Sequence, residues 1–466
     1  MKVIIVGAGE VGFHIAQKLA SENKDVVVID RDAAALKRVF EYLDVQCIEG
    51  SGSNPYVLQR AGIYDADVML AVTDSDETNI IASMFTSSLS PNITKLVRIR
   101  NADYIRFQED LRLIRLERGE KTLTTPGLDF GKIINPDEEV VKSIERLINF
   151  PQAEEINEFA DGRVKLVGVR AKSGQLIDKK LMQVREIIGY DIGFVIAAIV
   201  RGDKTIIPSG ENFVRDGDVV YFVCQEKDIH KIMRFFGYEY KPVNNILIIG
   251  GGTISRLLAM RYERNGPHVK IIEKSPQRCD SLAKELSRAV ILEGDGTDQE
   301  LLQEENVESM DLIISLTGDE ETNILTSLLA KKLGAGKAIT RIDKYAYFPL
   351  VRAIGIENMV SARRSAVNTI LKFMRKGKVL SAASISGDEA EAIEAVAQDN
   401  SIIVGKTLMD VDLPKGSLIL TIMRNGEIIF PTGSSVIKSQ DRVIILSTRK
   451  NVDKIEKALA FKPEKH

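Results

Sequence analysis

Residues 5–20 read IVGAGEVGFHIAQKLA, and residues 248–263 read IIGGGTISRLLAMRYE. In the first stretch Gly7, Gly9 and Gly12 lie between an apolar β-branched run and a helical pattern, and an acid, Asp30, ends the next such run. The first glycine permits a tight turn, the second lets phosphates approach the start of a helix, and the third lets that helix pack against the strand. The stretch therefore predicts a dinucleotide-binding site.

The second stretch belongs to an internal repeat. Gly250 corresponds to Gly7 and Glu273 to Asp30 at the same spacing, and AVTDSDETNIIAS (71–83) corresponds to SLTGDEETNILTS (315–327). A shorter segment follows each copy, and the two segments also resemble each other: PSGENFVRDGDVVYF (208–222) has a partner beginning at Pro431. Order and spacing preserved over such lengths indicate duplication. We predict four modules, at residues 1–123, 143–233, 244–362 and 368–457, with a linker at 236–245.

The pattern within each copy predicts an α/β fold. Short β-branched runs such as KVIIVG, DVVVID and VMLAVT alternate with stretches of helical periodicity. This alternation is typical of a doubly wound, Rossmann-like parallel sheet. The shorter segments, with short strands, polar turns and a closing amphipathic helix, predict a small α+β domain after each Rossmann-like domain.

Ligand-binding residues are expected at the carboxyl edge of the first sheet. Asp30 should accept hydrogen bonds from an adenosine ribose and repel a 2′-phosphate, which favours NAD(H) over NADP(H); ATP or ADP offers the same ribose and phosphates and stays open. Thr73 and Asp74 could alternatively form only a turn. Arg98 and Arg100, expected on one face of a strand, could hold phosphates or form exposed ion pairs. The predicted first site comprises Gly7, Ala8, Gly9, Glu10, Val11, Gly12, Asp30, Arg31, Ser51, Gly52, Thr73, Asp74, Arg98 and Arg100.

The second copy departs from the pattern at Ser255, which replaces the third glycine. Its side chain is expected to push the helix slightly off the sheet, and Lys274 is expected to pair partly with Glu273. This copy either binds the same class of ligand or is a degenerate structural repeat. Its predicted site comprises Gly250, Gly251, Gly252, Thr253, Ile254, Glu273, Asp295, Thr317 and Arg341.

Composition excludes several functions. A formal net charge of −3, from 63 basic and 66 acidic residues, gives no positive field for nucleic acid. The three cysteines are widely spaced, which argues for a reducing compartment and against a cysteine metal site. No apolar run is long enough to insert into a bilayer. The four histidines form no catalytic motif, so we expect no catalytic residues, no bound metal and no enzymatic activity.

The motifs GAGEVG with Asp30, EGSGS, AVTDSDETN and VRIR, followed by PSGENFVRDGDVVYF and then duplicated, resemble the tandem-RCK nucleotide-binding subunits of Trk potassium-uptake systems. The resemblance covers nearly the whole chain. It implies a cytoplasmic, peripheral protein, a homo-oligomeric (tetrameric) ring on the inner face of the cell membrane, which binds NAD(H) and ATP or ADP and regulates a transmembrane potassium-channel subunit. It also implies nucleotide contacts from the two glycine loops, the two acids, Thr73, Asp74 and Arg98. Two alternatives remain: an NAD-dependent oxidoreductase of the saccharopine-dehydrogenase type, and a regulator of a different cation transporter.

Overall fold

The computed structural model describes residues 1–117, 130–189, 191–202, 204–344, 346–356, 358–374, 379–385, 389–399 and 401–459. The predicted end of the first module, at residue 123, lies outside these ranges. The chain divides into two compact units. The first combines Met1–Lys142 with Ile342–Tyr345 and Val360–Met374, and the second contains the remainder. No helix in the described ranges is long and apolar enough to cross a membrane.

The first unit is built on a six-stranded parallel sheet in the order β3-β2-β1-β4-β5-β6. Its strands are β1 (Lys2–Val6), β2 (Asp25–Asp30), β3 (Gln46–Glu49), β4 (Val68–Ala71), β5 (Thr94–Arg98) and β6 (Lys132–Ile134). Its helices are α1 (Glu10–Ser21), α2 (Ala33–Tyr42), α3 (Pro55–Arg60), η1 (Ile63–Asp65), α4 (Asp76–Leu89), α5 (Ala102–Glu117) and α14 (Ala362–Met374).

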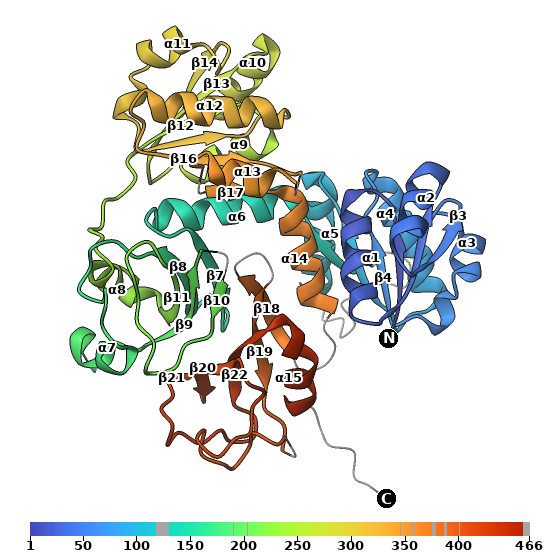
Figure 1. Cartoon of the computed structure of the whole chain (residues 1–466). Helices are drawn as coiled ribbons and strands as arrows, with labels where there is room; N and C mark the ends of the chain where they lie inside the picture. Colours follow the sequence, from blue (N-terminus) through green and yellow to red (C-terminus); the bar gives the residue numbers. More distant parts are fainter. Residues whose placement is uncertain are drawn as a thin grey trace, which may run out of the picture. The chain divides into compact units, whose positions relative to one another are not determined.

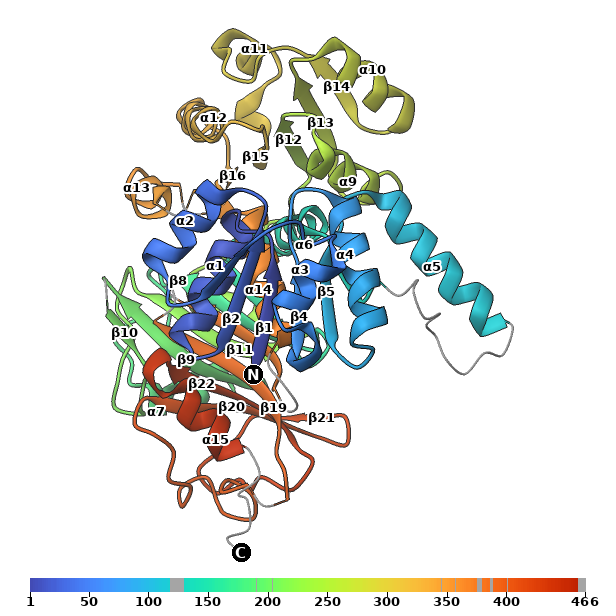
Figure 2. The same ribbon diagram turned by 90° about the vertical axis from the view of Figure 1, so that its right-hand side faces the viewer.

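Both faces of this sheet are covered. Successive side chains of a strand point to opposite faces, so each strand contributes to two cores. On β1, Val3 and Ile5 join one core while Ile4 and Val6 join the other, and all four are buried. Figure 2 shows α1 and α2 on one side of the strands and α3 and α4 on the other. The β-branched runs of the sequence are thus strands buried on both faces, as a doubly wound fold requires.

Helix α14 comes from the far end of the second glycine-motif copy but packs against α1 (Figure 1). Its buried residues Ala366, Val367 and Ile370 belong to the same core as Val3 and Ile5. A segment late in the chain therefore completes the first Rossmann-like domain.

The second unit contains the repeated Rossmann-like domain, whose six-stranded sheet has the equivalent order β14-β13-β12-β15-β16-β17. Its strands are β12 (Asn245–Ile249), β13 (His268–Glu273), β14 (Val290–Glu293), β15 (Leu312–Ser315), β16 (Lys337–Arg341) and β17 (Asn358–Val360). The last residue of β17, Val360, is counted with the first unit. Its helices are α9 (Thr253–Arg261), α10 (Pro276–Glu285), α11 (Gln299–Glu304), η3 (Val307–Ser309), α12 (Glu320–Lys332) and α13 (Tyr347–Ala353). Helix α6 (Pro136–Asn149) precedes the first small domain.

The two small domains are antiparallel sheets with the strand orders β10-β9-β11-β8-β7 and β18-β19-β22-β20-β21. The first has β7 (Glu155–Phe159), β8 (Val164–Arg170), α7 (Leu181–Ile188), β9 (Phe194–Arg201), β10 (Lys204–Ile206), β11 (Val219–Gln225), η2 (Glu226–Asp228) and α8 (Ile229–Phe235). The second has β18 (Val379–Ile385), β19 (Ala390–Val396), β20 (Ser417–Arg424), β21 (Glu427–Ile429), β22 (Arg442–Thr448), η4 (Arg449–Asn451) and α15 (Val452–Leu459).

One ion pair is repeated in both small domains. Asp218 accepts two hydrogen bonds from the Arg201 guanidinium, at 3.0 and 2.8 Å, and Asp441 accepts two from Arg424, at 2.9 and 2.7 Å. Both aspartates are almost fully buried, so the forked pairing balances a charge that could not be buried alone. The predicted fold class, two Rossmann-like domains each followed by a small α+β domain, is confirmed.

Candidate functional site

The predicted first site lies where the strand order reverses, between β1 and β4. In an open α/β sheet the loops at this edge diverge and leave a crevice beyond the carboxyl ends of the strands. The turn at Gly7 has φ of +114°, and a Cβ there would lie only 3.0 Å from the backbone nitrogen of Thr73. The glycine turn and the loop after β4 therefore meet at this edge.

Gly12 and Gly9 have different roles in the glycine loop. A Cβ on Gly12 would lie 1.8 Å from the Gly7 carbonyl oxygen, so only glycine lets α1 pack this close to the turn. A Cβ on Gly9 would find no atom within 4 Å. Gly9 is the N-cap of α1 and no side chain caps the helix, which leaves N–H groups at its start open to an anion. The space over Gly9 is therefore open at the start of the helix.

Asp30 holds the glycine loop in place. Its carboxylate accepts a hydrogen bond from the Ala8 N–H at 2.6 Å and another from the Asp32 N–H at 2.9 Å. A carboxylate has about four acceptor positions, so it retains capacity for ribose hydroxyls. The same side chain can therefore shape the loop and bind the ligand.

The loop after β3 lies at the same edge of the sheet. A Cβ on Gly52 would lie 2.0 Å from Val6 Cγ1, so the loop lies directly on the end of β1. Ser51 and Ser53 share a hydrogen bond of 2.7 Å between their hydroxyls, and Arg31 is exposed next to Asp30. These residues are brought to the predicted edge.

Arg98 and Arg100 both reach Asp74 but differ in burial. Arg98 Nη1 lies 2.9 Å from Asp74 Oδ1, and Arg100 Nη2 lies 3.5 Å from it. Only Arg98 belongs to β5; Arg100 lies beyond the strand, so the expectation of two arginines on one strand face was wrong. The Arg98 side chain is 9% exposed, and that of Arg100 is 47% exposed.

Sequence reasoning missed Asn79, which is fully buried on α4. Its side chain accepts from the Thr73 N–H and donates to the carbonyls of Thr73 and Arg98, at 2.9 to 3.0 Å. Asn323 makes the same contacts to Thr317 and Arg341 in the second copy. The asparagine ties the loop after the fourth strand to the end of the fifth. Its role could have been inferred from the sequence ETN, which occurs in both copies.

The second site keeps the frame of the first. A Cβ on Gly252 would find no atom within 4 Å, and Glu273 accepts from the N–H groups of Gly251 and Ser275 at 2.7 and 2.8 Å. Ser255 is fully buried and its hydroxyl donates to the Gly250 carbonyl at 2.5 Å. The loop thus accommodates the Ser255 side chain through this hydrogen bond. The remaining loop residues, Thr253 and Ile254, begin α9.

Charges around the second acid are paired differently from the expectation. Lys274 lies 2.9 Å from Asp295 rather than pairing with Glu273, and Arg278 is the cation 3.8 Å from Glu273. The N–H of Thr297 and the Lys274 ammonium both donate to Asp295, which lowers its pKa to about 2. Asp295 therefore carries a negative charge at neutral pH, at the position that Ser51 occupies in the first copy.

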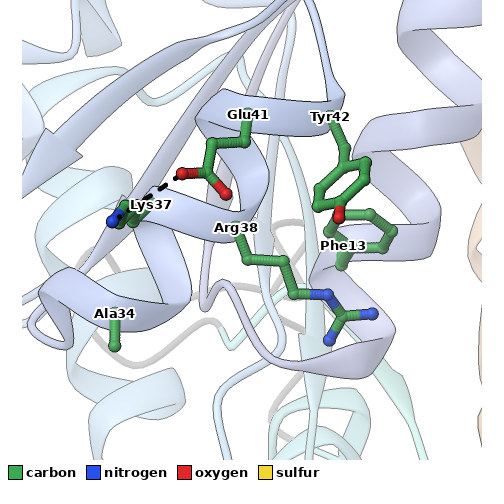
Figure 3. Close-up of a pocket in the computed structure, with 6 residues that line it drawn as sticks. All are labelled: Phe13, Ala34, Lys37, Arg38, Glu41 and Tyr42. Carbon is green, nitrogen blue, oxygen red and sulfur yellow. Dashed lines mark ion pairs between the residues drawn. The ribbon is translucent and has the colours of Figure 1, made fainter.

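Two further features of the first domain lie beside the glycine loop. Glu10 accepts a hydrogen bond from Arg38, which lowers the Glu10 pKa, and it lies 3.9 Å from Arg363 of α14. Figure 3 shows a hollow between α1 and α2, in which Arg38 lies over the Phe13 ring. The hollow is lined by Phe13, Ala34, Lys37, Arg38, Glu41 and Tyr42. None of these residues belongs to the predicted nucleotide site.

Among the described residues, no group of three or more His, Cys, Asp or Glu side chains is arranged to hold a metal. The histidines that the structure describes are His14 on α1, His230 on α8 and His268 on β13. His466 lies outside the described ranges. His14 is 3.5 Å from Glu10, and His230 packs between the rings of Phe150 and Tyr240.

Known protein families and individual proteins are similar to this chain. The TrkA-N domain model matches residues 3–114 and 246–362, and the TrkA-C domain model matches residues 166–237 and 392–460. The Trk system potassium uptake protein TrkA of Haemophilus influenzae is 37% identical over 462 residues, 98% of each chain. That of Vibrio alginolyticus is 35% identical over 98% of each chain. A homologue from Methanosarcina mazei is 36% identical over 98% of this chain and 99% of its own.

Solved structures share the fold. The GsuK RCK domain superposes with a TM-score of 0.59 at 16% identity, covering 98% of this chain and 94% of that one. The GsuK channel bound to NAD gives a TM-score of 0.60 at 16% identity, covering 98% and 78%. At this identity the likeness concerns the fold alone.

Proposed function

The chain belongs to the TrkA family of Trk-system potassium uptake proteins, and from this premise we propose that it is a nucleotide-sensing regulatory subunit. It binds NAD(H), and ADP or ATP, at the two glycine loops and regulates potassium uptake through a transmembrane channel subunit. It acts from the cytoplasmic face of the membrane, as a homo-oligomeric ring that is peripheral to the membrane through its partner.

One observation carries the ligand assignment. At the starts of α1 and α9, the space that a Cβ of Gly9 or Gly252 would enter is open, and a carboxylate holds each loop in place. A nucleotide phosphate at these positions would receive backbone hydrogen bonds and the favourable end of a helix dipole. The solved channel bound to NAD, with the same fold, supports a dinucleotide as one ligand class.

Regulation is proposed in place of catalysis because the four histidines of the sequence form no catalytic motif. A bound nucleotide shifts a conformational equilibrium when its affinity differs between the two states. The similar proteins are named as potassium uptake proteins, which favours a potassium channel over another cation carrier as the partner.

The deciding experiment reconstitutes the chain with its membrane partner in vesicles and measures potassium flux with NADH, NAD, ADP and ATP. We expect flux to change with nucleotide in the wild type and not in a Gly9→Ala/Gly252→Ala double variant. Nucleotide-independent flux in a complex shown to bind nucleotide would refute the regulatory role. Steady consumption of NADH with a small metabolite would instead support the oxidoreductase.

A further inference from the structure

The two partners of the ion pair between Arg98 and Asp74 differ greatly in solvent exposure. The Arg98 side chain is 9% exposed, whereas that of Asp74 is 89% exposed. Arg98 Nη1 also lies 3.3 Å from the Thr73 carbonyl oxygen and 3.5 Å from that of Val72. The guanidinium is therefore fixed under the loop after β4, while the carboxylate bonded to it can leave for solvent.

The buried guanidinium also has unused hydrogen-bonding capacity. Within the described residues, Arg98 Nε is buried and makes no hydrogen bond. Arginine carries five donors in a planar fork that suits carboxylate and phosphate oxygens alike. A phosphate can replace the Asp74 carboxylate on Arg98 with bonds of the same kind.

The pair lies next to the phosphate-binding turn. Thr73, whose carbonyl contacts Arg98, has its backbone nitrogen 3.0 Å from the place of a Cβ on Gly7. One residue therefore separates the turn from the arginine. A ligand that extends its phosphates from the start of α1 toward β4 meets Arg98 and Asp74 together.

We propose that Asp74 is an internal competitor for the phosphates of the nucleotide, occupying Arg98 and Arg100 when the first site is empty. This inference rests on the proposed function, since it concerns the same site. Binding has to displace the carboxylate from Arg98, and the displaced charge stays close enough to repel the ligand. Asp74 thus weakens binding more as the ligand carries more phosphate charge, and leaves the affinity for adenosine unchanged.

The second site provides the natural comparison. Its sequence SLTGDEETN has Gly318 where AVTDSDETN has Asp74, and Asn323 binds the Arg341 carbonyl as Asn79 binds that of Arg98. A Cβ on Gly318 would find no atom within 4 Å, and the backbone there is not left-handed. The second site therefore lacks the competing carboxylate but has room for one.

The test is calorimetric titration of the full chain with adenosine, ADP and ATP at low salt. Asp74→Asn should tighten ADP and ATP at one of the two sites about threefold to tenfold, as expected for an exposed charge bonded to a cation, and leave adenosine unchanged. Gly318→Asp should weaken ADP and ATP at the other site by a similar factor. Both effects should shrink as salt is added.

Asp44→Asn is the matched control. Asp44 lies in the exposed connection before β3, at the amino end of that strand, whereas the predicted site lies at the carboxyl ends. Its substitution removes the same unit of charge. It should leave all three affinities unchanged. Unfolding temperatures of all variants are measured to establish that each folds.

The outcomes separate the two proposals. If the wild type binds none of the three ligands, the proposed function fails and this inference with it. If the wild type binds ADP but Asp74→Asn binds it more weakly, Asp74 is a ligand contact and the competition is refuted. An unchanged ADP affinity, or an equal change for adenosine, refutes the competition as well.

Discussion

Alanine at Gly9 should remove nucleotide binding from the first site without destabilising the fold. Gly9 has φ of −64° and ψ of −176°, which alanine adopts freely, and its Cβ would touch nothing within 4 Å. Alanine is a poorer N-cap than glycine by roughly 0.5 kcal/mol, and the stiffer unfolded chain offsets about the same amount. The free energy of unfolding should therefore change by less than about 0.5 kcal/mol.

The same methyl group occupies the space that a phosphate needs. Each hydrogen bond to a charged group contributes about 1.5–3 kcal/mol, so losing one raises the Kd about tenfold to a hundredfold. Calorimetry with ADP and NADH should show Gly9→Ala losing one of two sites, Gly252→Ala losing the other, and the double variant losing both. Gly210→Ala, in a loop of the first small domain where a Cβ makes only ordinary contacts, serves as the control.

Wild-type affinity at both sites in Gly9→Ala would show that the phosphate binds elsewhere. A loss of affinity together with a large drop in the unfolding temperature would show that the open space over Gly9 is not the cause.

Three further substitutions follow from the structure. Gly12→Ala places a Cβ 1.8 Å from the Gly7 oxygen and should lower the free energy of unfolding by about 1–3 kcal/mol in urea denaturation; wild-type stability would contradict the packing described. Asn79→Ala leaves buried backbone groups without partners, so a loss of about 2–4 kcal/mol is expected, and a change below about 0.5 kcal/mol would count against it. Burial and then Arg234 lower the pKa of His230 below 6.5, so the unfolded state binds protons first as pH falls. Stability should therefore decline as pH drops through about 6.5, and His230→Phe should flatten that decline in unfolding temperatures; an unaltered pH profile would exclude the histidine as its source.

Much of the fold could be predicted because duplication repeats every local signal. Two copies of a glycine loop, an acid and a β-branched run leave little freedom in the order of the strands. Local patterns could not indicate the partner of α14, because its apolar face is compatible with either Rossmann-like domain. That choice is made by tertiary packing against α1.

The site was predictable where a residue acts through its own backbone or at a strand end. Gly9, Gly12 and Asp30 have roles set by their place in the motif. The pairing of Lys274 with Asp295 was not predictable, because it depends on how far two loops approach. Likewise the burial of Arg98 depends on the carbonyls above it and not on its neighbours in sequence.

The place of α14 in the first core has a consequence for synthesis. Ala366, Val367 and Ile370 emerge from the ribosome long after the strands that they cover. Until then the nascent first domain presents an apolar surface suited to a chaperone, and a fragment ending at residue 142 would keep that surface uncovered. Separately expressed halves should aggregate, or dissolve only when mixed.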